Sequence, residues 1–137
     1  LNKRVKFLNE VIAKLGLNGI TAIHGRAEDF AKQGEYREQF DFVVSRAVAN
    51  LASLSEYCLP YVKAGGFFVP YKSGSIDEEL AEAEKAVSVL GGTIKQVERF
   101  TLPESEIERT LVVVEKVKAT PKKYPRKAGL PAKEPIH

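Results

Sequence analysis

The sequence predicts an α/β fold in which helices flank a parallel sheet. Amphipathic segments alternate with short apolar runs typical of strands, and such alternation implies right-handed crossovers between parallel strands. One run, residues 40–44, is apolar apart from Asp41, which is typical of a strand buried on both faces. The length of 137 residues, with 44% hydrophobic and 28% charged residues, suits one globular domain with its own core.

Residues 1–34 provide the first three predicted elements. Residues 1–15 predict an amphipathic helix that ends at Gly16, because apolar side chains recur at steps of three and four. The β-branched run at 20–23 predicts a strand. Residues 28–33 predict a single helical turn, which Gly34 closes.

Residues 40–70 continue the alternation. The strand at 40–44 is followed by a helix predicted at 49–59, which Pro60 stops because proline cannot continue a helix. The glycine pair at 65–66 predicts a turn, and residues 67–70 predict the next strand.

The last elements are a helix and two consecutive strands. Ser75 and Glu78 have the spacing of a capping box, in which each side chain satisfies a backbone donor at the start of a helix. Strands are predicted at 93–100 and 110–117, on either side of an acidic loop at 103–108. Two strands in succession indicate an antiparallel hairpin at one edge of the sheet.

Several classes of protein are excluded by the composition. Cys58 is the only cysteine, so an internal disulfide framework is excluded, and no apolar run approaches the roughly 20 residues of a membrane span. We therefore expect a reduced, cytoplasmic protein with no membrane partner. The two histidines cannot supply a metal site, and no glycine-rich nucleotide loop or catalytic triad is present. Because the sequence lacks Met and starts at Leu1, we expect part of a longer protein; the alternative is removal of a starting Met.

Positive charge is concentrated at the end of the chain. Residues 1–116 carry 15 Lys and Arg against 17 Asp and Glu, a net charge of −2, whereas residues 117–137 carry a net charge of +5 and four of the seven prolines. We therefore divide the chain into a body, 1–117, and a basic, Pro-rich arm, 118–137, that runs extended over a surface. Such an arm suits a polyanion, and the alternative is a solvated tail that binds nothing. Tyr124 is predicted either to stack on a base or to pack the arm onto the body.

Polar loops follow three of the predicted strands. They are the segments 24–29, 45–47 and 71–73. Since α/β sheets bind ligands beyond the carboxyl ends of their strands, these loops are the candidates for a binding site.

Six segments resemble the glucose-inhibited division protein B family, which are S-adenosylmethionine-dependent methyltransferases that modify nitrogen-7 of a guanine in small-subunit (16S) ribosomal RNA. The tail string is the most specific of them, because so unusual a composition rarely recurs by chance. The resembling segments are Leu1–Leu8, Gly25–Glu28, Ser45–Ala49, Tyr57–Pro60, Lys63–Gly66 and Thr120–Gly129.

The resemblance implies a class I (Rossmann-like) methyltransferase sheet with flanking helices. The family's first strand, with its glycine-rich cofactor loop, and its second strand, with its acidic end, are missing here, so the chain is expected to be the C-terminal portion. In this fold the two missing strands lie between the strands at 20–23 and 40–44. Their absence is expected to expose strand edges, to favour self-association, and to leave the chain alone unable to bind S-adenosylmethionine well.

The resemblance also implies which residues meet the ligands. Ala27 and Glu28 match the run that lies against the cofactor adenine, and Arg46 matches an arginine beside the cofactor. The alternatives are a helix N-terminal acid for Glu28 and a surface ion pair for Arg46. Lys72 is a weaker candidate for RNA contact, with an ordinary snorkelling lysine as the alternative. The residues of the arm expected to contact RNA are Lys122, Lys123, Tyr124, Arg126 and Lys127.

The implied reaction needs no catalytic acid or base. Nitrogen-7 of guanine carries a free lone pair and no proton, so proximity and alignment suffice, and no catalytic residue is predicted. We expect Ala27, Glu28 and Arg46 to line one wall of the cofactor pocket near a groove for RNA. The rival interpretations are a non-enzymatic RNA- or ribosome-binding module and half of a nucleotide-binding oxidoreductase.

Overall fold

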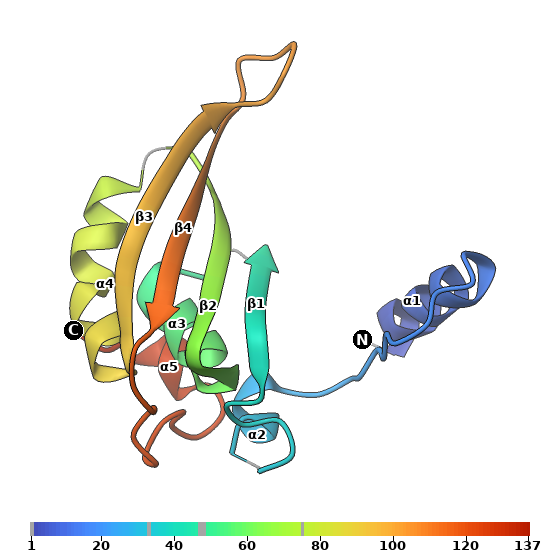
Figure 1. Cartoon of the computed structure of the whole chain (residues 1–137), viewed down its shortest axis with the longest axis horizontal. Coiled ribbons are helices and arrows are strands. Elements are labelled where there is room, and N and C mark those ends of the chain that lie inside the picture. The colour runs from blue at the N-terminus through green and yellow to red at the C-terminus, as the bar shows by residue number, and fades with distance from the viewer. Residues whose placement is uncertain (1, 33, 47–48, 75) are drawn as a thin grey trace.

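A four-stranded sheet forms the centre of the molecule (Figure 1). The computed structural model describes residues 2–32, 34–46, 49–74 and 76–137. The strands are β1 (Phe40–Arg46), β2 (Val62–Ser73), β3 (Gly92–Thr101) and β4 (Glu108–Lys116). The helices are α1 (Asn2–Lys14), α2 (Ala27–Phe30), α3 (Leu51–Cys58), α4 (Asp77–Val89) and α5 (Leu130–Lys133), with a 3₁₀ turn, η1 (Leu59–Tyr61), after α3.

The sheet combines a parallel pair with an antiparallel hairpin. Its strand order is β1-β2-β4-β3, with β1 parallel to β2 and with β4 antiparallel to both β2 and β3. The crossover from β1 to β2 passes through α3, as the alternation of elements predicts. The hairpin of β3 and β4 is confirmed, and β3 is an edge strand.

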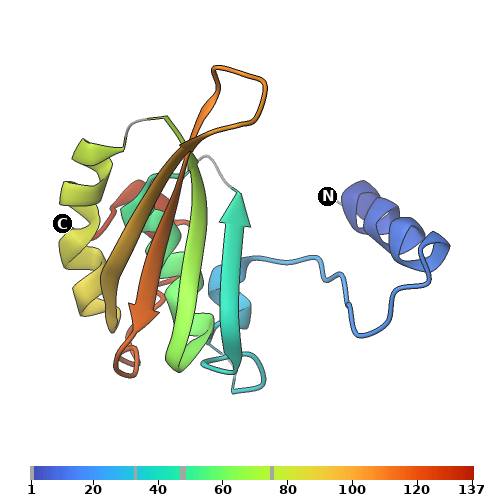
Figure 2. The same ribbon diagram turned by 45° about the horizontal axis from the view of Figure 1, so that its top comes forward.

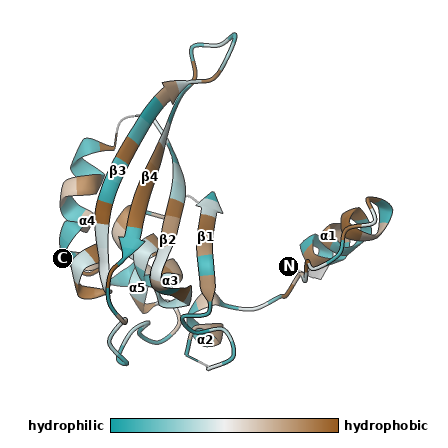
Figure 3. Ribbon diagram, viewed as in Figure 1, coloured by the Kyte–Doolittle hydropathy of each residue, from teal (hydrophilic) through white to brown (hydrophobic). Residues whose placement is uncertain are grey.

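The core lies between the sheet and the helices α3 and α4, which cover the same face together with α5 (Figures 1 and 2). Along β4 the residues alternate between buried and half-buried, and Val112 and Val114 are fully buried toward the helices. Leu51 and Leu54 of α3 and Val87 of α4 pack in the same cluster. Figure 3 shows hydrophobic residues along the strands of the sheet.

The outer strand β1 is far more exposed than the sequence predicts. Phe42 is 68% exposed and Val44 62% exposed, so the predicted burial on both faces is wrong. The reason is that β1 pairs only with β2, and no described helix covers the open face of the sheet. The run 20–23 is extended chain and not a strand, because no described strand lies beside it. Both observations agree with the gap that the family resemblance implies.

The glycine pair lies inside β2 and not in a turn before it. The pairing between β1 and β2 is irregular, because Phe40 pairs with Val62 while Phe42 pairs with Phe67. The extra residues of β2 are accommodated where a Cβ on Gly66 would lie 2.6 Å from the carbonyl oxygen of Asp41. Glycine is therefore required for the close approach of the two strands.

Helix starts differ from the predictions in two places. Asn50 caps α3, because its Oδ1 accepts a hydrogen bond of 2.9 Å from the backbone nitrogen of Ser53. Ile76 occupies the cap position of α4 and makes no side-chain cap bond. The predicted capping residue Ser75 lies outside the described residues, as do Leu1, Gln33, Ala47 and Val48.

Helix α1 stands away from the sheet at the end of an extended segment (Figures 1 and 2). The predicted helix is confirmed, but its apolar side is not covered, and Phe7, Leu8 and Leu15 are exposed. Among the helices in the described part of the chain, none has the length and apolar composition that crossing a membrane requires.

Candidate functional site

Ala27 and Glu28 lie on α2, and both use their polar groups within the protein. The Glu28 side chain is buried, and its Oε2 accepts a hydrogen bond of 2.9 Å from the backbone nitrogen of Gly129 in the arm. The Ala27 carbonyl oxygen accepts a hydrogen bond of 2.5 Å from the Tyr61 hydroxyl. These contacts fasten α2 to η1 and to the arm.

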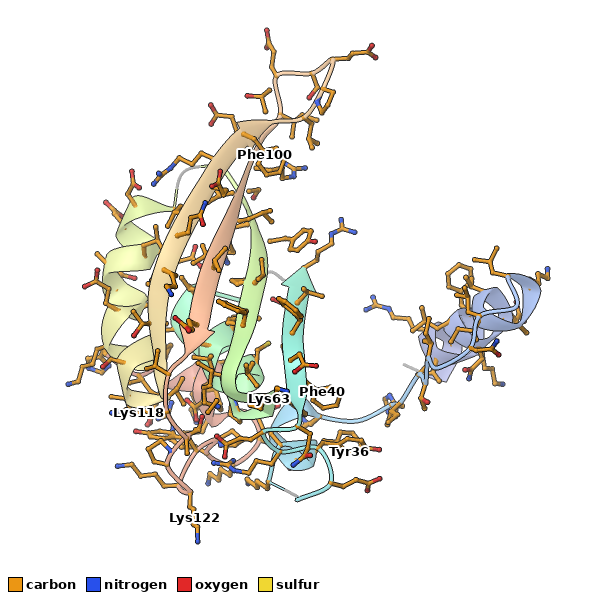
Figure 4. All side chains as sticks on the ribbon, viewed as in Figure 1. Tyr36, Phe40, Lys63, Phe100, Lys118 and Lys122 are labelled. Atoms are coloured by element: carbon orange, nitrogen blue, oxygen red, sulfur yellow. The ribbon has the colours of Figure 1, made fainter. Side chains whose placement is uncertain are left out.

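An apolar cavity of about 340 Å³ lies beside Ala27. Two aromatic pairs shape this region: Phe30 meets Tyr36 edge-on at 5.8 Å, and Phe40 lies 6.3 Å from Tyr61. Burial raises the pKa of Tyr61 to about 12, with the nearby Cys58 and Glu28 adding to the rise. Aromatic side chains therefore form much of the wall of the cavity. The cavity is lined by Ile23, Gly25, Ala27, Phe30, Tyr36, Phe40 and Tyr61, of which Figure 4 labels Tyr36 and Phe40.

Arg46 lies at the other end of the sheet. It is the last residue of β1, exposed and paired in register with Tyr71, whereas Phe40 at the start of β1 borders the cavity beside Ala27. A strand of this length spans about 20 Å. Figures 1 and 2 likewise show α2 near the start of β1 and away from its arrowhead.

The structure therefore brings Ala27 and Glu28 together but does not place Arg46 with them. In the described part of the chain residues 20–23 pair with no strand, and α2 packs at the amino end of β1, so Arg46 lies apart from the other two. In this structure Glu28 Oε2 and the Ala27 carbonyl oxygen each accept a hydrogen bond from the protein itself. A cofactor role for the three residues stays a prediction.

Lys72 is engaged inside the body. Its side chain is 9% exposed, and its Nζ lies 2.7 Å from the Glu79 carboxylate and 2.9 Å from the carbonyl oxygen of Ala49. The ion pair joins β2 to α4, and the ammonium does not reach solvent as the snorkelling alternative expects. RNA contact by Lys72 stays a prediction.

The arm packs against the body along much of its length. Arg37 donates to three of its carbonyl oxygens, those of Thr120, Pro121 and Tyr124, at 2.7–3.2 Å. Thr120 is buried and donates through its hydroxyl to the carbonyl oxygen of Leu90. The arm contains turns and the short helix α5, whereas the sequence predicts an extended course.

Two residues of the arm have inward roles. Arg126 forms a double hydrogen bond with the buried carboxylate of Glu56, and this bonding raises the pKa of Arg126. Tyr124 is partly buried against the core cluster, which is the packing alternative of the two that the sequence allows. Nothing in the sequence pattern singles out Arg37 or Glu56 as their anchors, because Arg37 is 87 residues from Tyr124 and Glu56 is 70 residues from Arg126.

The remaining lysines of the arm face outward. Exposed side chains are found at Lys118, Lys122, Lys123, Lys127 and Lys133. Figure 4 shows Lys122 pointing away from the body at the end of the sheet where β1 and β2 begin. Lys123 lies over the ring of Tyr124, with its Nζ 5.3 Å from the ring centre. The arm thus offers a cluster of positive charge on a fixed backbone.

The amino-acid sequence matches one protein family over most of its length. The GidB family model, described as rRNA small subunit methyltransferase G, matches residues 1–112. Two relatives named ribosomal RNA small subunit methyltransferase G are similar to nearly the whole chain. The protein of Lachnoclostridium phytofermentans is 58% identical, and the match covers 99% of this chain and 56% of the relative. The protein of Desulforamulus reducens is 59% identical, and the match covers 99% of this chain and 57% of the relative. The chain spans a little over half the length of these curated relatives.

Solved structures confirm the predicted fold class. The crystal structure of M. jannaschii TYW2 in complex with AdoMet superposes with a TM-score of 0.55 and 14% identity, covering 82% of this chain and 53% of that one. The crystal structure of a mutant of MtNAS superposes with a TM-score of 0.56 and 18% identity, covering 86% of this chain and 42% of that one. At these identities the likeness extends to the fold alone.

Proposed function

The chain belongs to the GidB family of small-subunit rRNA methyltransferases, and from this premise we propose that it forms part of an enzyme that methylates nitrogen-7 of a guanine in 16S ribosomal RNA. The methyl donor in this proposal is S-adenosylmethionine. The observation that carries the proposal is the identity of 58–59% over 99% of the chain with relatives of that name. The proposed location is the cytoplasm, where this RNA is made.

The chemistry of the acceptor fits the residues available. Because nitrogen-7 of guanine has a lone pair and no proton, the protein needs to hold and align the base and need not remove a proton. The cavity beside Ala27 has aromatic walls, and Arg46 offers a planar cation that can bond to a guanine edge or a phosphate.

The basic arm supports RNA, or the small ribosomal subunit, as the partner. Lysines that neutralise phosphates release counterions, and this term supplies affinity without sequence preference. The five exposed lysines of the arm are placed to act in this way.

We expect the chain by itself to bind the cofactor poorly and to transfer no methyl group. Arg46 lies at the opposite end of β1 from Ala27, and β1 has a free edge. The remaining length of the relatives is proposed to provide the rest of the pocket.

The test joins this chain to the segment of the Lachnoclostridium phytofermentans relative that it does not match. The fusion and the chain alone are each incubated with radiolabelled S-adenosylmethionine and small ribosomal subunits that lack the modification, and the RNA is digested and analysed for 7-methylguanosine. We expect the product with the fusion and none with the chain alone. A well-folded fusion that yields no 7-methylguanosine would refute the proposal.

A non-enzymatic RNA-binding module is the second candidate, favoured by the fixed arm with its outward lysines. Strongly salt-dependent RNA binding by the fusion, without methyl transfer, would support this alternative.

A further inference from the structure

Glu56 is a buried carboxylate whose hydrogen-bond partners, among the residues that the structure describes, all belong to one residue of the arm. It lies on α3 with no exposed surface, among the apolar residues of the core. Its oxygens accept from the backbone nitrogen of Arg126 at 2.8 Å, from Nε at 3.0 Å and from Nη2 at 2.7 Å. A buried carboxylate is stable only when it is paired and hydrogen-bonded, so Glu56 holds residue 126 in one place.

The anchor fixes both the backbone and the side chain of Arg126. Because its guanidinium also donates to the carbonyl oxygen of Glu134, the cation predicted from the sequence to meet RNA is turned toward the protein. Its neighbours Lys122, Lys123 and Lys127 are exposed instead. A flexible segment with this charge would lose conformational entropy on binding, and a fixed one does not.

We propose that Glu56 is a positioning residue for RNA: through Arg126 it holds the arm so that Lys122, Lys123 and Lys127 form a preorganised surface for the phosphate backbone. The inference rests on the proposed RNA partner and deepens it. The phosphate backbone fits better than a lipid surface, because the exposed lysines have no exposed apolar side chain between them: Tyr124 is half-buried and Pro125 is buried.

The substitution Glu56→Gln separates positioning from simple charge. It removes one negative charge, so electrostatic attraction alone would make RNA binding tighter. If the carboxylate positions the arm, the substitution makes binding weaker, by about tenfold when the docked arm falls to a tenth of the population. The two explanations therefore predict opposite signs.

The experiment measures binding of a fluorescent hairpin from small-subunit rRNA to the full chain by anisotropy over a range of salt concentrations. Glu84→Gln, at an exposed position of α4, is the control for the change in charge, and we expect equal or slightly tighter binding for it. Ser53→Ala is a second, milder variant, because it removes the bond of 2.7 Å from the Ser53 hydroxyl to the carbonyl oxygen of Pro131 without any change in charge. We expect weaker binding for it too, and faster cleavage of the arm by trypsin in both anchor variants.

Coupling to the lysines completes the test. In a chain that carries Lys122→Ala, Lys123→Ala and Lys127→Ala, Glu56→Gln should weaken binding no further, since the three lysines that Arg126 is proposed to position are gone. Equal or tighter binding by Glu56→Gln in the otherwise unchanged chain would overturn the positioning role and leave the RNA partner intact. Absence of RNA binding by the unchanged chain would overturn both, whereas the methyl-transfer assay on the fusion tests the enzymatic proposal separately.

Discussion

Replacement of Glu38 by glutamine tests how the body and the arm stabilise each other. The Lys116 side chain has no exposed surface, and its Nζ donates to the carbonyl oxygens of Leu59 and Val62 and lies 3.1 Å from the Glu38 carboxylate. The same carboxylate accepts from the backbone nitrogen of Thr120 at 3.0 Å. The substitution Glu38→Gln would keep the shape of the side chain but leave the buried ammonium without a counter-charge.

The expected cost is about 2 kcal/mol in the free energy of unfolding. Removing one partner of a buried ion pair costs roughly 3–5 kcal/mol. The lower value follows here because Glu38 is 26% exposed and because Lys116 keeps its two carbonyl partners. For a chain of this size, such a loss lowers the melting temperature by roughly 6–8 °C.

The cost should also depend on pH. Burial lowers the pKa of Lys116 from its ordinary value of 10.5, and Glu38 opposes that change, so its removal lowers this pKa further. In the Glu38→Gln variant, the charged Lys116 ammonium lowers the free energy of unfolding most at neutral pH. As the pH rises through the folded-state pKa toward 10.5, Lys116 loses its proton in the folded state before it does so in the unfolded state, and this cost becomes smaller. The difference between Glu38→Gln and the unchanged chain should therefore shrink in alkali.

Urea unfolding followed by circular dichroism or tyrosine fluorescence measures the effect, since the chain has five tyrosines and no tryptophan. Glu84→Gln serves as the matched control and should change the unfolding free energy by less than about 0.5 kcal/mol. Equal stabilities for the two variants at neutral pH would refute the structural role of the Glu38–Lys116 pair.

Three further predictions concern other parts of the molecule. Burial raises the pKa of Cys58 from 9.0 to about 12, so the thiol ionises in the unfolded chain first, and the free energy of unfolding should fall as the pH rises above 9. This decline should amount to about 1.4 kcal/mol per pH unit, and it should be absent from Cys58→Ala in urea unfolding curves measured over a pH series. In the fusion protein, Arg46→Ala should lower methyl transfer or cofactor affinity, and an unchanged variant in both assays would leave Arg46 without such a role. The chain should self-associate at high concentration in sedimentation experiments through the free edge of β1, and Phe42→Lys should reduce this association, because charge on an edge strand opposes strand pairing.

Sequence reasoning located the elements whose pattern is local. The helix at the start, the parallel pair around α3 and the final hairpin all follow from periodicity, from Pro60 and from the order of elements. The strand expected at 20–23 failed for a physical reason, since a strand exists only beside a partner and none is described there. The same reason explains the exposure of β1, whose apolar sequence is suited to a neighbour on each side.

The candidate site was harder to predict because it depends on contacts between distant residues. Composition shows that the arm is basic, but it does not show that Arg126 turns inward to Glu56 while Lys122 turns outward. Likewise, the family resemblance picks out Glu28 as a ligand-side residue, whereas in this structure Glu28 bonds to Gly129. Such pairings arise from packing, which no pattern along a single chain records.

The docked arm also has a consequence for how the protein is made. Residues 118–137 are the last of this sequence to leave the ribosome, yet they satisfy Glu56 and the partner of Lys116, which belong to segments translated earlier. Until the arm has been synthesised, the buried carboxylate of Glu56 lacks its hydrogen-bond partner Arg126. A product that lacks residues 118–137 should therefore fold less stably than one that contains them.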